Sequence, residues 1–172
     1  MPRYTYRVPG TVFLSTTMPI IHEHGGTSFA MQKQPHGVIA KIINDALITG
    51  LPYCYQIVNE YEQPLYSIDC KFPGIGYTFT DYVCSQTVSF KSHRVQLMEK
   101  AYSFTLSNHE YYIENDHTGV GHLKCDNTHV ATVSRLSATT ISTDDTVVIQ
   151  ATTQEMAVIA AVLYHTFYYI GA

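Results

Sequence analysis

The sequence carries little charge, and its charge is not basic. Asp, Glu, Lys and Arg make up 14% of the 172 residues, Lys and Arg number only 10, and the net charge is −4. A nucleic-acid-binding protein is expected to present a basic face to the phosphate backbone. The composition therefore disfavours nucleic acid as a partner.

Closely spaced cysteines, a signal-like apolar run in the first residues and linker-like stretches are also lacking. None of the cysteines forms a C-x-x-C pair, which predicts reduced thiols in a cytoplasmic protein rather than a disulfide framework. The first seven residues contain no apolar run of the kind found in a secretory signal. No stretch rich in Pro, Gly or Ser divides the chain, so we expect a single domain over residues 1–172. The four cysteines are Cys54, Cys70, Cys84 and Cys125.

Alternation of apolar and polar residues runs through most of the chain. Tyr102, Phe104 and Leu106 alternate with polar residues, which indicates a strand with one buried face. Asp126-Asn127 predicts a two-residue hairpin turn, and Ser92-His93 is interpreted as another short turn. By the same pattern we predict strands at 53–58, 65–70, 87–91, 95–97, 111–113, 120–125, 128–136 and 147–149.

The N-terminal part has a weaker pattern. Residues 11–15 and 28–32 fit strands separated by Gly25-Gly26, and residues 38–43 fit either a strand or a short helix. Gly50-Leu51-Pro52 ends that last element.

The C-terminal segment predicts a helix with no polar side. Thr152 followed by Glu155 suggests a capping box at its start. The residues from Met156 to Ile170 are apolar around the whole helix, which is typical of a membrane span or a fully buried helix. The apolar part is shorter than the roughly 20 residues that a bilayer crossing needs. The basic residues that usually flank a tail anchor are also missing, which disfavours that interpretation. We therefore expect a buried helix at about 153–170, with a helix packed on one face of a sheet as the alternative.

Many short strands followed by one apolar helix require a fold that protects the edges of the sheet and encloses the helix. An open antiparallel sheet has edges to protect, and a helix without a polar side needs walls all around it. A closed antiparallel barrel of about 12 strands around the C-terminal helix meets both demands. The predicted fold class is therefore all-β with one central helix.

Four stretches of the sequence resemble the tubby C-terminal-domain-like superfamily, which includes LURP-one-related proteins and phospholipid scramblases. Two of them are strand–turn–strand units at residues 55–66 and 111–124, and a third is the final strand and helix at 145–170. The fourth, Tyr4-Thr-Tyr-Arg-Val-Pro9, is similar to the start of short bacterial members. The resemblance implies a barrel of about twelve strands around a hydrophobic C-terminal helix.

The resemblance does not by itself assign a function, because one fold can host several. Tubby itself resembles a phosphoinositide-binding adaptor, and scramblases are linked to membranes. For this chain we predict a non-enzymatic binding or scaffold module of unknown ligand. This chain departs from the lipid-linked members: no membrane-spanning tail follows the barrel, no EF-hand-like acidic run is present, and Lys and Arg number only 10.

Lys91-Ser92-His93-Arg94 is the densest basic stretch of the chain. Lys91, His93 and Arg94 are therefore the candidate binding residues, for an anionic lipid headgroup or a protein partner at the barrel surface. The alternative is a solvated hairpin turn with no ligand.

The 9 histidines invite a metal-dependent or other enzymatic alternative. His22 and His24 share one face if they lie in a strand. In the hairpin at Asp126-Asn127 we expect Lys124 opposite His129 and His122 opposite Ala131, so that the two histidines are diagonal neighbours. No run of ligands has the tight spacing of a structural metal site, and the G-x-S-x-G, H-E-x-x-H and P-loop motifs are missing. We therefore predict no catalytic residues, metal or cofactor.

His165 lies on the apolar helix. We expect it to be a buried histidine that bonds to a wall carbonyl or a tyrosine, or a ligand contact if one end of the barrel is open. Taken together, the sequence predicts a cytoplasmic binding module without a transmembrane segment, and we expect any association with a membrane to be peripheral.

Overall fold

The computed structural model describes residues 1–12, 16–35, 53–71, 76–94, 100–136 and 144–169. These residues form one antiparallel sheet and a C-terminal helical segment. The strands are β1 (Arg3–Val8), β2 (Thr17–His22), β3 (Thr27–Pro35), β4 (Tyr53–Asn59), β5 (Pro64–Lys71), β6 (Gly76–Asp81), β7 (Gln86–Ser89), β8 (Lys91–Arg94), β9 (Lys100–Leu106), β10 (His109–Asn115), β11 (Gly121–Cys125), β12 (Thr128–Leu136) and β13 (Asp145–Ala151). The helices are α2 (Gln154–Tyr164) and the π-helix η1 (His165–Tyr169).

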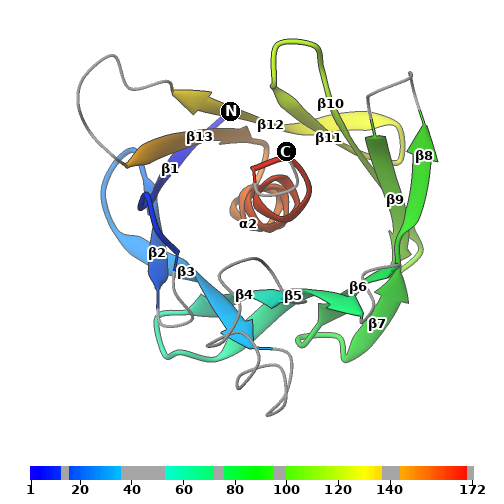
Figure 1. Cartoon of the computed structure of the whole chain (residues 1–172), viewed down its shortest axis with the longest axis horizontal. Coiled ribbons are helices and arrows are strands. Elements are labelled where there is room, and N and C mark those ends of the chain that lie inside the picture. The colour runs from blue at the N-terminus through cyan, green and yellow to red at the C-terminus, as the bar shows by residue number, and fades with distance from the viewer. Residues whose placement is uncertain (13–15, 36–52, 72–75, 95–99, 137–143, 170–172) are drawn as a thin grey trace.

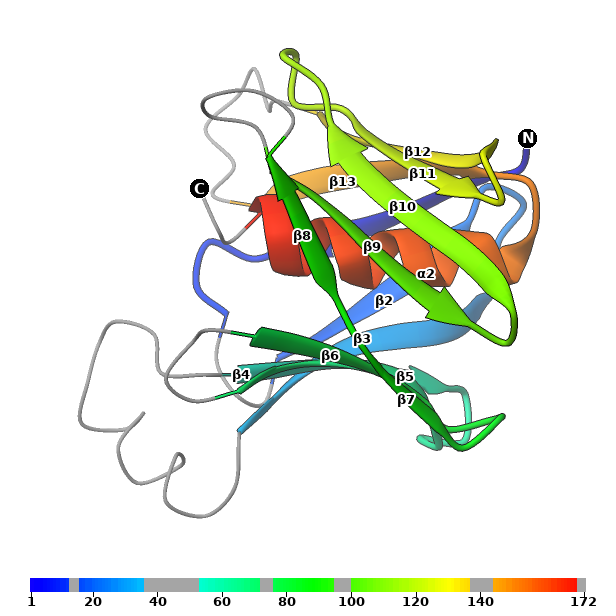
Figure 2. The same cartoon turned by 90° about the vertical axis from the view of Figure 1, so that its right-hand side faces the viewer.

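The sheet curls into a nearly closed barrel around α2 (Figure 1). Its 13 strands follow the order β7-β6-β5-β4-β3-β2-β1-β13-β12-β11-β10-β9-β8, so β1 and β13 are neighbours although they lie far apart in sequence. The two end strands of this order, β7 and β8, are separated by Phe90 alone. Segment 86–94 therefore pairs with β6 through its first half and with β9 through its second half. In Figure 2, β8 runs on into β7 across the front of α2.

The predicted architecture is confirmed: the structure is mostly antiparallel strand with one central C-terminal helical segment. The predicted turn at Ser92-His93 is wrong, because both residues lie in β8 and pair with Tyr102 and Ala101. Three strands were missed, namely β1, β2 and β6. Thr11 and Val12 are not in a strand. The predictions for residues 13–15, 38–43, 50–52 and 95–97 lie outside the described residues.

The helix begins one residue later than the predicted capping box implies. Thr153 is the N-cap, and its hydroxyl oxygen accepts a hydrogen bond from the backbone N–H of Met156 at 3.2 Å. Glu155 is used differently, because its carboxylate accepts a hydrogen bond from the Tyr66 hydroxyl at 3.2 Å. The helix start is thus tied to the barrel wall through β5 as well as capped by Thr153.

The interior of the barrel is filled by the helix. Every α2 residue from Ala157 to Tyr164 is buried, as are His165, Thr166 and Phe167 of η1. Burial on all sides explains why this segment has no polar face. The helical residues run from 154 to 169, close to the predicted 153–170. Of the helices that the structure describes, none has the length and apolar character needed to cross a membrane.

The strands of the barrel wall also contribute to the core, because the side chains at alternate positions of each strand point inward. On one side of the helix, the rings of Phe79 (β6), Phe104 (β9) and Tyr111 (β10) stack in sequence with centroids 4.9 Å apart. Phe167 stacks on Tyr102 of β9 with ring centroids 3.8 Å apart. Aromatic stacking of this kind adds to the free energy gained from burial alone, and it joins the C-terminal turn of the helix to the wall near β8.

Candidate functional site

The predicted basic residues lie on β8, where the barrel closes. Lys91, Ser92 and His93 are exposed, and the register pairs Lys91 with Ser103. Because side chains alternate along a strand and Tyr102 faces the core, Lys91 and His93 lie on the outer face of the barrel. The backbone of Arg94 pairs with that of Lys100, but its side chain lies outside the described part of the structure. The structure thus brings Lys91 and His93 together.

His93 connects β8 to the neighbouring strands. Its Nε2 lies 2.8 Å from the Ser103 hydroxyl of β9, and its ring centroid lies 6.0 Å from that of Tyr112 on β10. The Lys124 ammonium of β11 lies 5.6 Å from the Tyr112 ring centroid on the same face. Lys91, His93, Tyr112 and Lys124 therefore form a continuous outer surface across β8–β11, here called the β8–β11 face.

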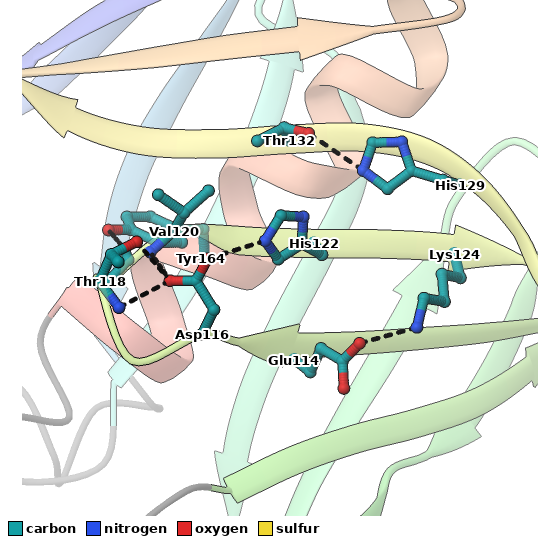
Figure 3. A network of polar contacts seen from close by, with 10 residues as sticks. Glu114, Asp116, Thr118, Val120, His122, Lys124, His129, Thr132 and Tyr164 are labelled. Atoms are coloured by element: carbon teal, nitrogen blue, oxygen red, sulfur yellow. Dashed lines mark hydrogen bonds and ion pairs between the residues drawn. The ribbon is translucent and has the colours of Figure 1, made fainter.

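Beyond Lys124, polar contacts continue across β10, β11 and β12 (Figure 3). The Lys124 ammonium forms an ion pair with Glu114 at 2.7 Å, so its charge is already balanced. In contrast, the ion pairs of the described residues do not include Lys91. Within the described part of the β8–β11 face, Lys91 is therefore an exposed cation without a paired carboxylate.

Asp116 anchors the turn between β10 and β11. Its carboxylate accepts hydrogen bonds from the hydroxyl and backbone N–H of Thr118, at 2.6 and 2.8 Å, and from the Val120 N–H at 3.0 Å. The other oxygen lies 3.1 Å from Nε2 of His122. These donors hold the pKa of Asp116 well below its usual range, with the Thr118 hydroxyl as the largest cause. The arrangement is a typical Asx turn, so its role is structural.

The predicted neighbourhood of His122 and His129 is confirmed, with ring centroids 5.7 Å apart. Lys124 pairs with His129 as expected, but His122 pairs with Thr132 rather than Ala131, because the register shifts by one residue between Leu123 and Lys124. Burial, then the charges of His122 and Lys124, lower the pKa of His129. His129 Nε2 also lies 3.0 Å from the Thr132 hydroxyl.

The histidines that the structure describes do not converge on one site. His22 and His24 lie together at the end of β2, with ring centroids 5.1 Å apart, away from the pair on β11 and β12. The enzymatic alternative, which needs distant histidines at one centre, therefore gains no support. One group of three potential metal ligands is found in the described residues, and it contains a single histidine: His109, Cys125 and Asp126.

His165 is fully buried between the helix and the wall. Its Nδ1 lies 3.4 Å from the Tyr6 hydroxyl, which confirms the predicted tyrosine contact. Its Nε2 has no hydrogen-bond partner among the described residues. Burial, followed by the charge of Lys33, lowers the pKa of His165 from 6.5 to about 3. The imidazole is therefore neutral at neutral pH, as a core side chain must be.

A shallow pocket of about 310 Å³ lies at the end of the barrel where the helix ends, and the sequence analysis missed it. Tyr164, Tyr168 and Tyr169 line it together with Arg135. Arg135 is engaged within the protein, because its guanidinium lies 2.7 Å from Asp145, which also accepts a hydrogen bond from Tyr169 at 2.6 Å. The pocket is built from β12, the β10–β11 turn and the helix, so no local sequence pattern could have revealed it.

Comparison with known proteins agrees with this architecture. The search of curated proteins found no match, and the search of solved structures found none either. A family model does match, with the description Tubby C-terminal like domain, and it covers residues 4–170. That range includes all thirteen strands of the structure except the first residue of β1, and it includes the whole described helical segment. A nearly closed antiparallel barrel filled by its C-terminal helix, together with a family match over almost the entire sequence, shows that this chain belongs to the Tubby C-terminal like domain family.

Proposed function

We propose that this protein is a non-enzymatic binding module whose β8–β11 face contacts the anionic headgroups of a membrane surface. In this proposal it is a cytoplasmic protein that associates with the membrane only peripherally. Lys91 carries the proposal, because it is an exposed cation on the outer face that forms no ion pair with the described carboxylates. His93, Tyr112 and the backbone of Arg94 lie next to it.

The position of the helix supports a contact on the outside of the barrel. The side chains of α2 and of the inward strand positions occupy the interior, so a headgroup has no room in the core of the barrel. Each lysine or arginine near an acidic membrane surface contributes on the order of 1 kcal/mol of binding free energy. With Lys91 and Arg94 as the contributing cations, we therefore expect the protein to bind anionic membranes weakly and in a salt-sensitive way.

The competing explanation is that Lys91 protects a sheet edge. Short edge strands often carry lysine because its charge prevents pairing with another chain, and β8 is short, with four residues, at one end of the strand order. The two explanations differ in their consequences for binding. Edge protection predicts that replacing Lys91 changes aggregation but not attachment to vesicles.

Vesicle co-sedimentation tests the proposal. We expect the protein to sediment with vesicles that contain phosphatidylserine or phosphoinositide, and much less with vesicles of phosphatidylcholine alone. Replacement of Lys91→Glu together with Arg94→Glu should reduce sedimentation, as should added salt. Arg3→Glu with Arg7→Glu is the matched control, because it makes the same change in charge at exposed positions of β1, across the barrel from β8 (Figure 1).

Two results would reject the proposal. Equal sedimentation of the β8 variant and the wild-type protein would exclude the β8–β11 face as the contact. Binding that does not depend on anionic lipid would exclude headgroup recognition and direct the search to a protein partner at the same surface.

A further inference from the structure

Two hairpin turns lie side by side at the end of the barrel where α2 begins. Ser107-Asn108 connects β9 to β10, and Asp126-Asn127 connects β11 to β12. All four residues have positive φ, between 48° and 70°, the conformation that a tight two-residue hairpin requires. Strand β10 pairs with β11 so that Tyr111 faces Cys125. This register brings His109, the first residue of β10, next to the second turn.

Three different metal ligands meet between these turns. One imidazole nitrogen of His109, the Cys125 thiol and one carboxylate oxygen of Asp126 all lie within 4.8 Å of one another. Nδ1 of His109 is only 2.6 Å from the Asp126 carboxylate. An ion bonded to all three would bring sulfur to about 2.3 Å and nitrogen and oxygen to about 2.0–2.2 Å.

Neighbouring groups orient the Asp126 ligand. The Glu110 N–H donates a hydrogen bond to Asp126 at 2.9 Å, and the Asp126 N–H donates to the Glu110 carbonyl at 2.8 Å. Outer partners of this kind fix the direction of metal ligands and strengthen metal binding in known sites. Tyr111 lies directly opposite Cys125 in the paired strands β10 and β11.

The electrostatic environment also suits a cation. Burial raises the pKa of the Cys125 thiol, and the negative charges of Asp126 and Glu155 raise it further. The side chain is therefore a neutral thiol in the metal-free protein. A divalent cation would reverse this balance, since it attracts the same carboxylates and stabilises the thiolate.

We propose that His109, Cys125 and Asp126 form a binding site for a zinc ion that joins the two hairpin turns. The mixture of imidazole, thiolate and carboxylate is a ligand set that Zn²⁺ accepts, and water completes the tetrahedron. On binding, the Cys125 thiol releases its proton to solvent and its sulfur bonds to the metal. The ion would stabilise this end of the barrel without taking part in any reaction.

Cobalt substitution tests the proposal, because a thiolate bound to Co²⁺ gives a charge-transfer band in the near ultraviolet. Untagged protein is treated with a chelator, freed of it, and titrated with Co²⁺ alone. We expect the band to saturate at one ion per chain and to disappear when Zn²⁺ displaces the cobalt. Zn²⁺ should also raise the melting temperature of the metal-free protein, since an ion that binds only the native state stabilises it.

Single replacements decide which residues hold the ion. Cys125→Ser should abolish the band, whereas Asp126→Asn and His109→Gln should each weaken Co²⁺ binding at least tenfold. Asp126→Asn keeps a residue that tolerates positive φ, so the turn should persist. Cys84→Ser is the matched control, because Cys84 is an exposed cysteine in the turn between β6 and β7.

The proposal is overturned if wild-type protein gives no thiolate band, or if the band survives Cys125→Ser. A band that is lost in Cys125→Ser but unchanged in both Asp126→Asn and His109→Gln would also overturn it. That last result would mean that the metal binds to an isolated thiol and not to the three-residue site.

Discussion

The Tyr6 hydroxyl lies 3.4 Å from Nδ1 of His165, and 159 residues separate the two in sequence. The contact joins strand β1 to the helical segment inside the barrel. Tyr55 and Tyr169 enclose the same imidazole, with ring centroids 4.6 and 5.1 Å from it. A titratable side chain is thus surrounded by aromatic rings in the core, and this makes the stability of the fold sensitive to pH.

The barrel should lose stability as the pH falls below about 6.5, and His165 should account for part of the loss. Its pKa is lowered from 6.5 to about 3 in the folded protein, first by burial and then by the charge of Lys33. Between those values the unfolded chain binds the proton and the native chain does not, so acid favours unfolding. Between pH 6.5 and about 4.5, wild-type protein should lose roughly 2 kcal/mol more unfolding free energy than His165→Leu.

Urea unfolding at several pH values measures this difference. Tyr6→Phe is the control, since it removes the hydroxyl but keeps the buried imidazole, and its pH dependence should remain as steep as that of the wild-type protein. If His165→Leu showed the same pH dependence as wild type, the loss would have to come from other groups.

Gly121 should not tolerate a side chain. A Cβ at this position would lie 2.6 Å from Cδ2 of Tyr164, whose hydroxyl donates to the Gly119 carbonyl at 2.9 Å. Gly121→Ala must therefore displace the ring and is expected to cost about 1–3 kcal/mol of unfolding free energy. Gly76→Ala is the matched control, because a Cβ there meets nothing within 4 Å.

Chemical denaturation of both variants provides the measurement. The cost of Gly121→Ala should shrink in a protein that already carries Tyr164→Ala, because the two residues are in contact and their effects are not additive. A cost that is unchanged in that background would show that the Tyr164 ring is not the obstacle.

The first turn of α2 should depend on Thr153 and not on Thr152. Thr153 accepts the hydrogen bond from Met156 N–H, so Thr153→Ala is expected to cost about 1 kcal/mol of unfolding free energy. Thr152→Ala removes an exposed side chain and should change stability by less than about 0.5 kcal/mol. Thermal or urea unfolding of the two variants compares them directly, and the reverse order would restore Thr152 as the cap.

The small residues of α2 should be needed for stability, because they let the barrel wall pack closely around the helix. Ala161 is completely buried, and the larger side chain of Ala161→Leu would force the surrounding strands apart, at a cost of about 1–3 kcal/mol. Gln154→Leu places the same side chain at an exposed position of the same helix and should be close to neutral. Similar stabilities for the two variants would mean that the wall yields easily.

The architecture could be predicted because the composition of the C-terminal helix indicates that it is buried on all sides. A helix with Ala, Val, Ile and Leu on every side must be enclosed, and the regular alternation in residues such as Tyr102, Phe104 and Leu106 supplies the enclosing strands. The missed strands are short, with six residues each. In β1 the signal was clear, because Tyr4, Tyr6 and Val8 alternate with polar residues. In β2 the buried positions Met18 and Ile20 do alternate with exposed ones, but the exposed residues include Pro19 and the apolar Ile21, which hides the pattern in the sequence. For β6 a signal existed, because Tyr77 and Phe79 alternate with threonines, although the strand is short.

The candidate sites depend on register, which the sequence specifies less well. The basic residues at 91–94 were found by charge alone, but their assignment to a turn failed because one chain segment forms both β7 and β8. The group at His109, Cys125 and Asp126 has no recognisable spacing. It becomes apparent only when β10 is aligned with β11 so that Tyr111 faces Cys125.

The pairing of β1 with β13 has a consequence for biosynthesis. On the ribosome, β1 has to wait for almost the whole chain before its second neighbour is made, and the helix that fills the interior is made later still. Until then the inward rings of the wall face water with nothing to cover them. Folding therefore depends on late, long-range contacts, which are slow to form. Synthesis of the chain is the stage at which this protein is most exposed to aggregation.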